Sequence, residues 1–157
     1  MTEKDKNFMQ LAIELSLNSV KNHGGPFGAV IVKGGSIIAK ASNRVTLNND
    51  PTAHAEINAI RAACSALKTF DLSGCVLYTS CEPCPMCLGA IYWARIDKIF
   101  YANSRTDAKN IGFDDSFIYD ELEKPLAKRS IPATQIMQSE AMQAFEEWKQ
   151  KVDKIAY

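Results

Sequence analysis

Two short motifs, some thirty residues apart, constrain this chain more than any other feature. His54-Ala55-Glu56 stands near the start of one predicted helix, and Pro83-Cys84-Pro85-Met86-Cys87 stands at the start of another. Cys84 and Cys87 are three residues apart, so on a helix they lie on one face. The positive end of that helix favours thiolate, the form of cysteine that binds metal. The pattern therefore predicts a fold that brings the two motifs together around one metal ion.

The motifs also predict what kind of metal site this is. With His54 as the third ligand, a zinc ion has three protein ligands, and its fourth tetrahedral position is left for a water whose pKa falls to about 7. Glu56 is placed to move the proton of that water without binding the metal. Side chains two residues apart diverge by roughly 200° on a regular helix, so His54 and Glu56 converge only where the helix is just beginning. An Asp50 cap followed by Pro51 as the first helical residue predicts such a beginning.

Cys81 leaves other interpretations open. The run Cys81-x-x-Cys84-x-x-Cys87 also resembles the start of an iron–sulfur motif, or a closed structural zinc site with Cys81 as the fourth ligand. No fourth cysteine follows at the spacing that a cluster requires. Cys64 lies on an apolar helical stripe and Cys75 in a predicted strand, so both are expected to be core thiols. A non-catalytic metal-binding domain is thus the alternative from a different functional class.

Size and charge are those of one ordinary globular domain. The chain has 157 residues, 46% of them hydrophobic and 23% charged, which argues against a disordered or fibrous protein. Eighteen Lys plus Arg balance eighteen Asp plus Glu, so no net positive field gathers nucleic acid or an anionic membrane. The polar start, the lack of a long apolar run and the odd number of cysteines predict a cytoplasmic protein that is neither secreted nor inserted in a membrane.

Hydrophobic periodicity predicts an α/β fold. A hairpin comes first, and helices then alternate with strands, which indicates a sheet with helices on both faces. The strands are expected at 29–33, 36–41, 75–79, 98–102 and 134–137, with Gly34-Gly35 as the hairpin turn and 43–49 as a polar loop. The helices are expected around 8–15, from 51 onward, at 85–95 and after a Ser139 cap, with 105–110 a polar loop or short helix.

The paired motifs resemble those of the cytidine and nucleobase deaminase superfamily, whose His-x-Glu and Pro-Cys-x-x-Cys signature carries a zinc deaminase site. Longer strings resemble the guanine-deaminating bacterial branch of that superfamily: Gly24–Val30, Asn48–Thr52, Tyr78–Glu82, Leu88–Arg95 and Gly112–Phe117. The resemblance implies a three-layer αβα sandwich with a five-stranded mixed sheet. It also implies that residues 1–157 form a single zinc-dependent nucleobase deaminase domain, and that Cys81 is a loop residue and not a ligand.

The resemblance further implies an activity, a metal and an assembly. The reaction is hydrolytic deamination of guanine to xanthine and ammonia, with zinc-bound hydroxide adding to purine carbon 2 and Glu56 as the catalytic proton shuttle. His54, Cys84 and Cys87 are the implied zinc ligands. The implied assembly is a homodimer whose C-terminal segment docks on, or is exchanged with, the partner.

Several further residues are candidates for binding the purine. By resemblance, Asn43 and the backbone N–H of Ala55 hydrogen-bond the ring, Asp115 accepts hydrogen bonds from N1 and the N2 amine of guanine, and Tyr157 closes the pocket; Phe27 and Trp93 are placed to stack on the base. A turn role for Asn43, core packing for the aromatic residues and a frayed chain end at Tyr157 are the structural alternatives. A tRNA, nucleoside or aminotriazine deaminase shares both motifs, and the neutral charge argues against an RNA substrate.

Overall fold

The computed structural model describes residues 2–157, which divide into two compact units at Asp115. The first unit contains α1 (Glu3–Lys21), β1 (Gly28–Lys33), β2 (Ser36–Ser42), α2 (Val45–Asn48), α3 (Ala55–Leu67), β3 (Cys75–Cys81), α4 (Pro85–Trp93), β4 (Lys98–Asn103) and α5 (Arg105–Asn110). The second contains α6 (Ser116–Glu123), a 3₁₀ turn at Leu126–Lys128 and α7 (Gln138–Gln150).

A mixed sheet forms the centre of the first unit, in the order β2-β1-β3-β4. Strand β1 pairs antiparallel with β2 and with β3, and β3 pairs parallel with β4. The β1–β2 connection is the predicted two-glycine turn, since Gly34 and Gly35 have φ of 57° and 80°, in the left-handed region that glycine adopts at little cost. The predicted mixed α/β sheet is therefore confirmed.

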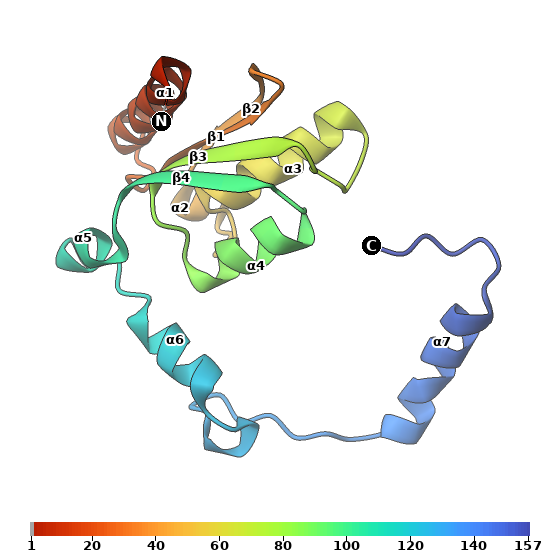
Figure 1. Ribbon diagram of the computed structural model, residues 1–157. Coiled ribbons are helices and arrows are strands. Elements are labelled where there is room, and N and C mark those ends of the chain that lie inside the picture. Colours follow the sequence, from red (N-terminus) through yellow and green to blue (C-terminus); the bar gives the residue numbers. More distant parts are fainter. Residues whose placement is uncertain (1) are drawn as a thin grey trace. The chain divides into compact units, whose positions relative to one another are not determined.

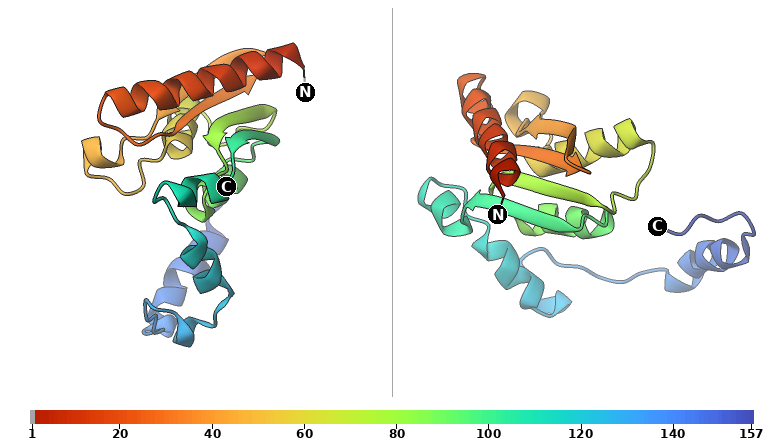
Figure 2. Two further views of the ribbon diagram at one scale, coloured as in Figure 1. Left: turned by 90° about the vertical axis from the view of Figure 1, so that its left-hand side faces the viewer. Right: turned by 45° about the horizontal axis from the view of Figure 1, so that its top comes forward.

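Helices cover both faces of this sheet, as Figure 1 shows. Helix α1 packs on one face, where Ala12 is buried against Val30 and Tyr78. Helices α3 and α4 pack on the other face, where Ala59 and Ile91 join a core that includes Leu77. Both views of Figure 2 show α1 on one side of the strands. Because neighbouring residues of β3 point to opposite faces, this strand contributes to both cores.

A polar contact also fastens α1 to the sheet. The Tyr78 hydroxyl, on the buried central strand β3, donates a hydrogen bond of 2.7 Å to Asp5 Oδ1 in the first turn of α1. The Tyr78 ring lies between Phe8 and Phe100, with ring centroids 5.3 Å and 5.0 Å away. This aromatic layer with its hydrogen-bonded hydroxyl places α1 on the sheet.

The prediction of five strands is wrong: the sheet has four. Residues 134–137 are irregular, and Met137 has a left-handed φ of 52°, which breaks an extended segment. An isolated extended segment leaves its backbone N–H and C=O groups unpaired, so a strand needs a neighbour to form. The polar loop 43–49 contains the short helix α2, and α7 begins at Gln138 after Met137, so the predicted Ser139 cap is also wrong.

The residues of the second unit are exposed or half-buried. None of residues 116–157 is buried, and its large apolar side chains face solvent, with Ile131 81% and Phe145 71% exposed. Isolated exposed apolar residues are normal on a surface, but a whole segment without a buried residue has no core of its own. No helix within residues 2–157 is long and apolar enough to cross a membrane.

Candidate active site

The start of α3 sets the geometry of the first motif. The helix begins at Ala55 and His54 is its N-cap residue, with an extended backbone at φ −67° and ψ 156°. The predicted cap at Asp50 is wrong, because Asp50 Oδ1 instead accepts hydrogen bonds of 2.8 Å and 2.7 Å from the N–H and hydroxyl of Thr52 in a separate turn. His54 lies just outside the helix and Glu56 just inside it. Their side chains can therefore converge although they are only two residues apart.

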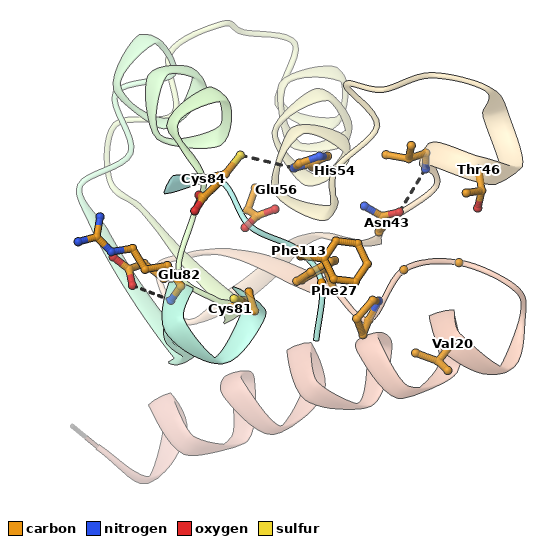
Figure 3. Close-up of a pocket in the computed structure, with 18 of the residues that line it drawn as sticks. Val20, Phe27, Asn43, Thr46, His54, Glu56, Cys81, Glu82, Cys84 and Phe113 are labelled. Carbon is orange, nitrogen blue, oxygen red and sulfur yellow. Dashed lines mark hydrogen bonds between the residues drawn. The ribbon is translucent and has the colours of Figure 1, made fainter. Parts of the chain in front are cut away.

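Helix α4 begins in the same way at the second motif. Cys84 is its N-cap residue and Pro85 its first helical residue, where a missing N–H costs nothing. Neither the His54 nor the Cys84 side chain caps its own helix. His54 Nδ1 instead lies 3.6 Å from Cys84 Sγ and 3.5 Å from Cys87 Sγ. Figure 3 shows His54 and Cys84 facing each other across the site.

The donor spacing fits a tetrahedral zinc ion. Zinc binds imidazole nitrogen at about 2.0–2.1 Å and thiolate sulfur at about 2.3 Å, so two such donors at a tetrahedral angle are about 3.6 Å apart. The nitrogen–sulfur distances of 3.5 and 3.6 Å match this value, and the three donor atoms all lie within 4.8 Å of one another. His54, Cys84 and Cys87 are therefore arranged as a three-residue zinc site.

The electrostatics of the two cysteines also suit a metal. Hydrogen bonds with Cys87 and with His54 lower the pKa of Cys84 to about 4, and the hydrogen bond with Cys84 raises the pKa of Cys87. The proton is therefore held more tightly by Cys87 than by Cys84. Both lie at the N-terminus of α4, where the helix dipole favours negative charge. Zinc binding then has to release the proton that Cys87 holds, because the ion binds thiolates.

Cys81 is not a member of the donor group. It is buried at the end of β3, and its Sγ donates to the backbone oxygen of Ser104 at 3.7 Å. Burial raises the pKa of Cys81 to about 11, so it is a thiol at neutral pH. The arrangement of three donors without Cys81 is that of a catalytic zinc site, in which one coordination position stays open. Cys75 is buried in the core and Cys64 packs against it, as predicted.

Glu56 lies beside the donor group without belonging to it. Its side chain is buried, with 5% exposed, and burial raises the pKa of its carboxyl. Oε1 accepts a hydrogen bond of 3.0 Å from the Thr79 hydroxyl, and Oε2 lies 3.6 Å from Cys87 Sγ. A carboxyl group in this position can exchange protons with a molecule at the metal while it stays off the metal itself.

A cavity of about 800 Å³ opens above these residues. Phe27 and Phe113 meet edge to face in its wall, with ring centroids 4.9 Å apart (Figure 3). Asn43 also lines it, and Asn43 Oδ1 accepts the N–H of Val45 at 3.2 Å. Asn43 therefore forms a turn and faces the cavity at once. A Cβ at Gly25 would lie 3.0 Å from Asn43 Oδ1, so a glycine lets this wall pass close to the amide.

Of the other candidate residues predicted from the sequence, some line the cavity and some do not. Asp115 lines the cavity and burial raises the pKa of its carboxyl. Neighbouring Asp114 also lines the cavity, and it forms an ion pair of 3.0 Å with Lys109. Ala55 is buried as the first residue of α3, where a helix N–H has no acceptor within the helix. Trp93 is 68% exposed and does not line the cavity.

Tyr157 belongs to the second unit, so its predicted role stays a prediction. Sequence reasoning missed Phe113 as a residue of the cavity wall. The signal was present, because Phe113 lies in the string Gly112–Phe117 that resembles the guanine-deaminating branch.

Comparison with known proteins agrees with this geometry. Residues 2–103 match the family described as the cytidine and deoxycytidylate deaminase zinc-binding region. The chain belongs to this family of zinc-binding deaminases.

Within the family it is similar to guanine deaminase from Bacillus subtilis, with 54% identity over 97% of this chain and 98% of that protein. The solved structure of a Bacillus subtilis guanine deaminase superposes with a TM-score of 0.95 and 52% identity, covering 100% of this chain and 99% of the other. A tRNA-specific adenosine deaminase from Aquifex aeolicus is 44% identical over 73% of this chain and 75% of its own length.

Proposed function

We propose that this protein catalyses zinc-dependent hydrolysis of guanine to xanthine and ammonia. The observation that carries the proposal is the buried Glu56 carboxyl beside a His-Cys-Cys donor group at the base of a cavity lined by aromatic residues. The similarity to guanine deaminase over almost the whole chain selects the substrate. A non-catalytic metal-binding domain has no use for a proton-transferring carboxyl at an open coordination position.

The proposed chemistry divides the work between the metal and the protein. Zinc held by His54, Cys84 and Cys87 supplies Lewis acidity that makes a water nucleophilic near neutral pH. Glu56 would take a proton from the attacking water and give it to ring nitrogen 3 as carbon 2 becomes tetrahedral. The carboxylate would then take the second proton from the new hydroxyl on carbon 2 and give it to the amino group, which leaves as ammonia as the carbon 2 carbonyl of xanthine forms. Phe27, facing Phe113, offers an aromatic surface to the base.

Hydrogen bonding favours guanine over adenine in this proposal. Guanine presents N1–H and its N2 amine as adjacent donors, which an ionised Asp115 carboxylate can accept together. Adenine presents an unprotonated N1, so the same carboxylate would face an acceptor without a proton between them. Sites built to hydrogen-bond one partner reject an analogue that leaves a buried polar group unpaired. Asn43 and the Ala55 N–H are proposed as further contacts to the ring.

A tRNA-specific adenosine deaminase is the second candidate, because relatives with that name match up to three quarters of the chain. RNA binding depends on Lys and Arg that neutralise phosphates. This chain carries as many acidic as basic residues, and it matches the guanine deaminase over a longer stretch at higher identity. An aminotriazine resembles the amino-substituted half of guanine and is a small-molecule alternative.

A substrate panel tests the activity. Ammonia release is measured with guanine, cytosine, adenosine, an aminotriazine and an adenosine-containing tRNA anticodon stem, using the zinc-loaded protein. Guanine is expected to give the highest kcat/KM, and Glu56→Gln is expected to keep zinc but to lose about 10²–10⁴ in kcat, since an amide cannot shuttle protons. Faster turnover of the tRNA stem would replace guanine by the second candidate.

Residues 1–157 are proposed to act as one deaminase domain that is completed in a homodimer. Strand β4 is an edge strand, with no neighbour on its outer side among residues 2–157, and none of residues 116–157 is buried. An open edge and an exposed apolar segment are both satisfied by exchange of the C-terminal segment with a second copy. The three-layer αβα sandwich and the cytoplasmic location are part of this proposal.

Sedimentation tests the assembly. We expect a dimer at micromolar concentration, and we expect a chain truncated after Asp115 to sediment as a monomer or to aggregate. A full-length protein that stays monomeric through this range would rule out the exchange. Mixing zinc-loaded Glu56→Gln with the truncated protein gives a further test, in which ammonia release from guanine is measured. The first chain lacks the carboxyl and the second lacks residues 116–157, so a swapped segment can restore a complete site between two defective chains.

A further inference from the structure

Thr79 is a hydroxyl residue where the sheet pattern calls for an apolar one. Residues Cys75, Leu77 and Thr79 alternate along β3 and so point to the same face, the one covered by α3 and α4. Cys75 and Leu77 are fully buried members of the core on that face. Thr79 is equally buried, with 0% exposed, and its register partner Ala29 on β1 is buried too. Valine has nearly the same shape and would fill this position without a polar group.

A buried hydroxyl is unfavourable unless it is hydrogen-bonded. The Thr79 hydroxyl donates to Glu56 Oε1 at 3.0 Å, and both side chains are buried. The bond joins the central strand β3 to the first turn of α3, twenty-three residues apart in the chain. Ser80, the next residue, points to the other face, and its Oγ accepts the N–H of Gly28 at 3.0 Å. The two adjacent buried hydroxyls thus have different hydrogen-bond partners: Ser80 bonds the backbone of Gly28, and Thr79 bonds the Glu56 carboxyl.

The two oxygens of Glu56 have different surroundings as a result. Oε1 is held by Thr79, whereas Oε2 lies 3.6 Å from the sulfur of Cys87. Oε2 therefore lies on the side of the donor group, whereas Oε1 lies on the side of β3.

We propose that Thr79 is a positioning residue that fixes the rotation of the Glu56 carboxyl, so that Oε1 is the anchored oxygen and Oε2 is the oxygen that carries protons. The last side-chain torsion of glutamate is broad and roughly two-fold, so packing of the stem alone does not set it. A hydrogen bond from a rigid, fully buried strand does. This inference rests on the proposed deaminase function for its kinetic consequence, but not for its structural one.

The test compares Thr79→Val, which keeps the shape and removes the donor, with Thr79→Ser, which keeps the donor. In the zinc-loaded protein Thr79→Val is expected to lower kcat for guanine by about 10-fold to 100-fold with KM within about twofold, as for a reacting group displaced by a fraction of an ångström. The solvent deuterium isotope effect on kcat is expected to rise, because proton transfer becomes slower. Thr79→Ser is expected to stay within about threefold of the unaltered protein.

Stability and metal content separate positioning from a general structural role. Thr79→Val is expected to keep one zinc per chain and to lower Tm no more than Ser80→Ala does, since each variant leaves one buried hydrogen-bonding group without its partner. Ser80→Ala is the matched control: it removes a buried acceptor of Gly28 N–H and is expected to lower Tm while kcat below that Tm is retained. If Thr79→Val does not fold, Thr79→Ala supplies the same comparison with Thr79→Ser.

A crystal structure of zinc-loaded Thr79→Val decides the proposal independently of activity. We expect the Glu56 carboxyl to be rotated or in two orientations, with a single orientation in the unaltered protein and in Thr79→Ser. An unmoved carboxyl with undiminished kcat would overturn the proposal, as would equal losses of kcat in the serine and valine variants. If the unaltered protein does not deaminate guanine, the proposed function fails, and the carboxyl orientation still decides the role of Thr79.

Discussion

Individual residues at two helix starts bring the metal-donor group of this protein together. His54 and Cys84 are N-cap residues with extended backbones, and neither uses its side chain to cap its helix. Serine, threonine, asparagine or aspartate at these positions would satisfy the free helix N–H groups. A histidine and a cysteine there instead direct their donor atoms toward each other. The helix starts therefore give up capping hydrogen bonds in favour of a metal site.

The ligand assignment predicts a sharp division among the cysteines. His54→Ala, Cys84→Ala and Cys87→Ala are each expected to lose zinc and activity together, because three ligands are the minimum for a catalytic zinc site. Cys81→Ser is expected to retain both, since the Cys81 thiol bonds the Ser104 carbonyl. Metal content of the purified proteins checks this. A Cys81→Ser protein without zinc would instead support the interpretation of a closed site with four protein ligands.

Asp115 is expected to recognise guanine through hydrogen bonds. Asp115→Asn should reduce kcat/KM for guanine by the penalty of an impaired buried hydrogen bond, about 1–3 kcal/mol, or roughly fivefold to 150-fold. Asp114→Asn is a matched neighbour that removes a solvent-exposed ion pair with Lys109, and its effect should be smaller. Steady-state kinetics of both variants on guanine measure the difference. Equal losses would remove the special role of Asp115.

At the scale of elements, the attachment of α1 to the sheet has a pH-dependent part. Hydrogen bonds from the Thr2 backbone and the Tyr78 hydroxyl lower the pKa of Asp5 to about 2 from an ordinary 3.8. A carboxyl whose pKa is depressed on folding adds stability that is present above its unfolded pKa and is lost as the pH falls toward its folded pKa. This contribution is therefore complete above about pH 4 and disappears between about pH 4 and 2.

Thermal unfolding of Asp5→Asn beside the unaltered protein checks this. The Tm difference between the two is expected to be largest near neutral pH and to shrink as the pH falls below about 4. Both proteins lose zinc in acid, so the difference between them isolates Asp5. Tyr78→Phe keeps the Thr2 hydrogen bond and should show a smaller change of the same sign. A pH-independent difference would contradict the assigned hydrogen bonds.

For the whole molecule, the C-terminal tail is expected to affect the reaction more than the fold. Deleting residues 153–157 should leave zinc content and Tm nearly unchanged, because all five are exposed. It should raise KM for guanine and slow turnover if Tyr157 closes an active site, since closure excludes water and completes the site. Kinetics of the truncated and full-length proteins on guanine decide this, and identical constants would show that Tyr157 is a frayed end.

Much of the site follows from local rules that a sequence displays directly. The spacing of Cys84 and Cys87 places both at the start of one helix, Gly34-Gly35 allows a tight turn, and apolar periodicity marks α1 and α3. These features depend on backbone geometry within a few residues. The candidate zinc donors and the neighbouring proton-transfer candidate could be named from the sequence for that reason.

Tertiary contacts decided what local rules left open or predicted wrongly. The Asp50 side chain prefers a turn with Thr52 to capping a helix, and this choice places His54 outside α3. Phe27 meets Phe113, and Thr79 meets Glu56, across distant parts of the chain. Residues 134–137 have strand-like composition but no strand neighbour. Pairings between distant segments depend on the packing of the whole fold, so the sequence determined the donors and the faces, and only the tertiary structure decided which of them meet.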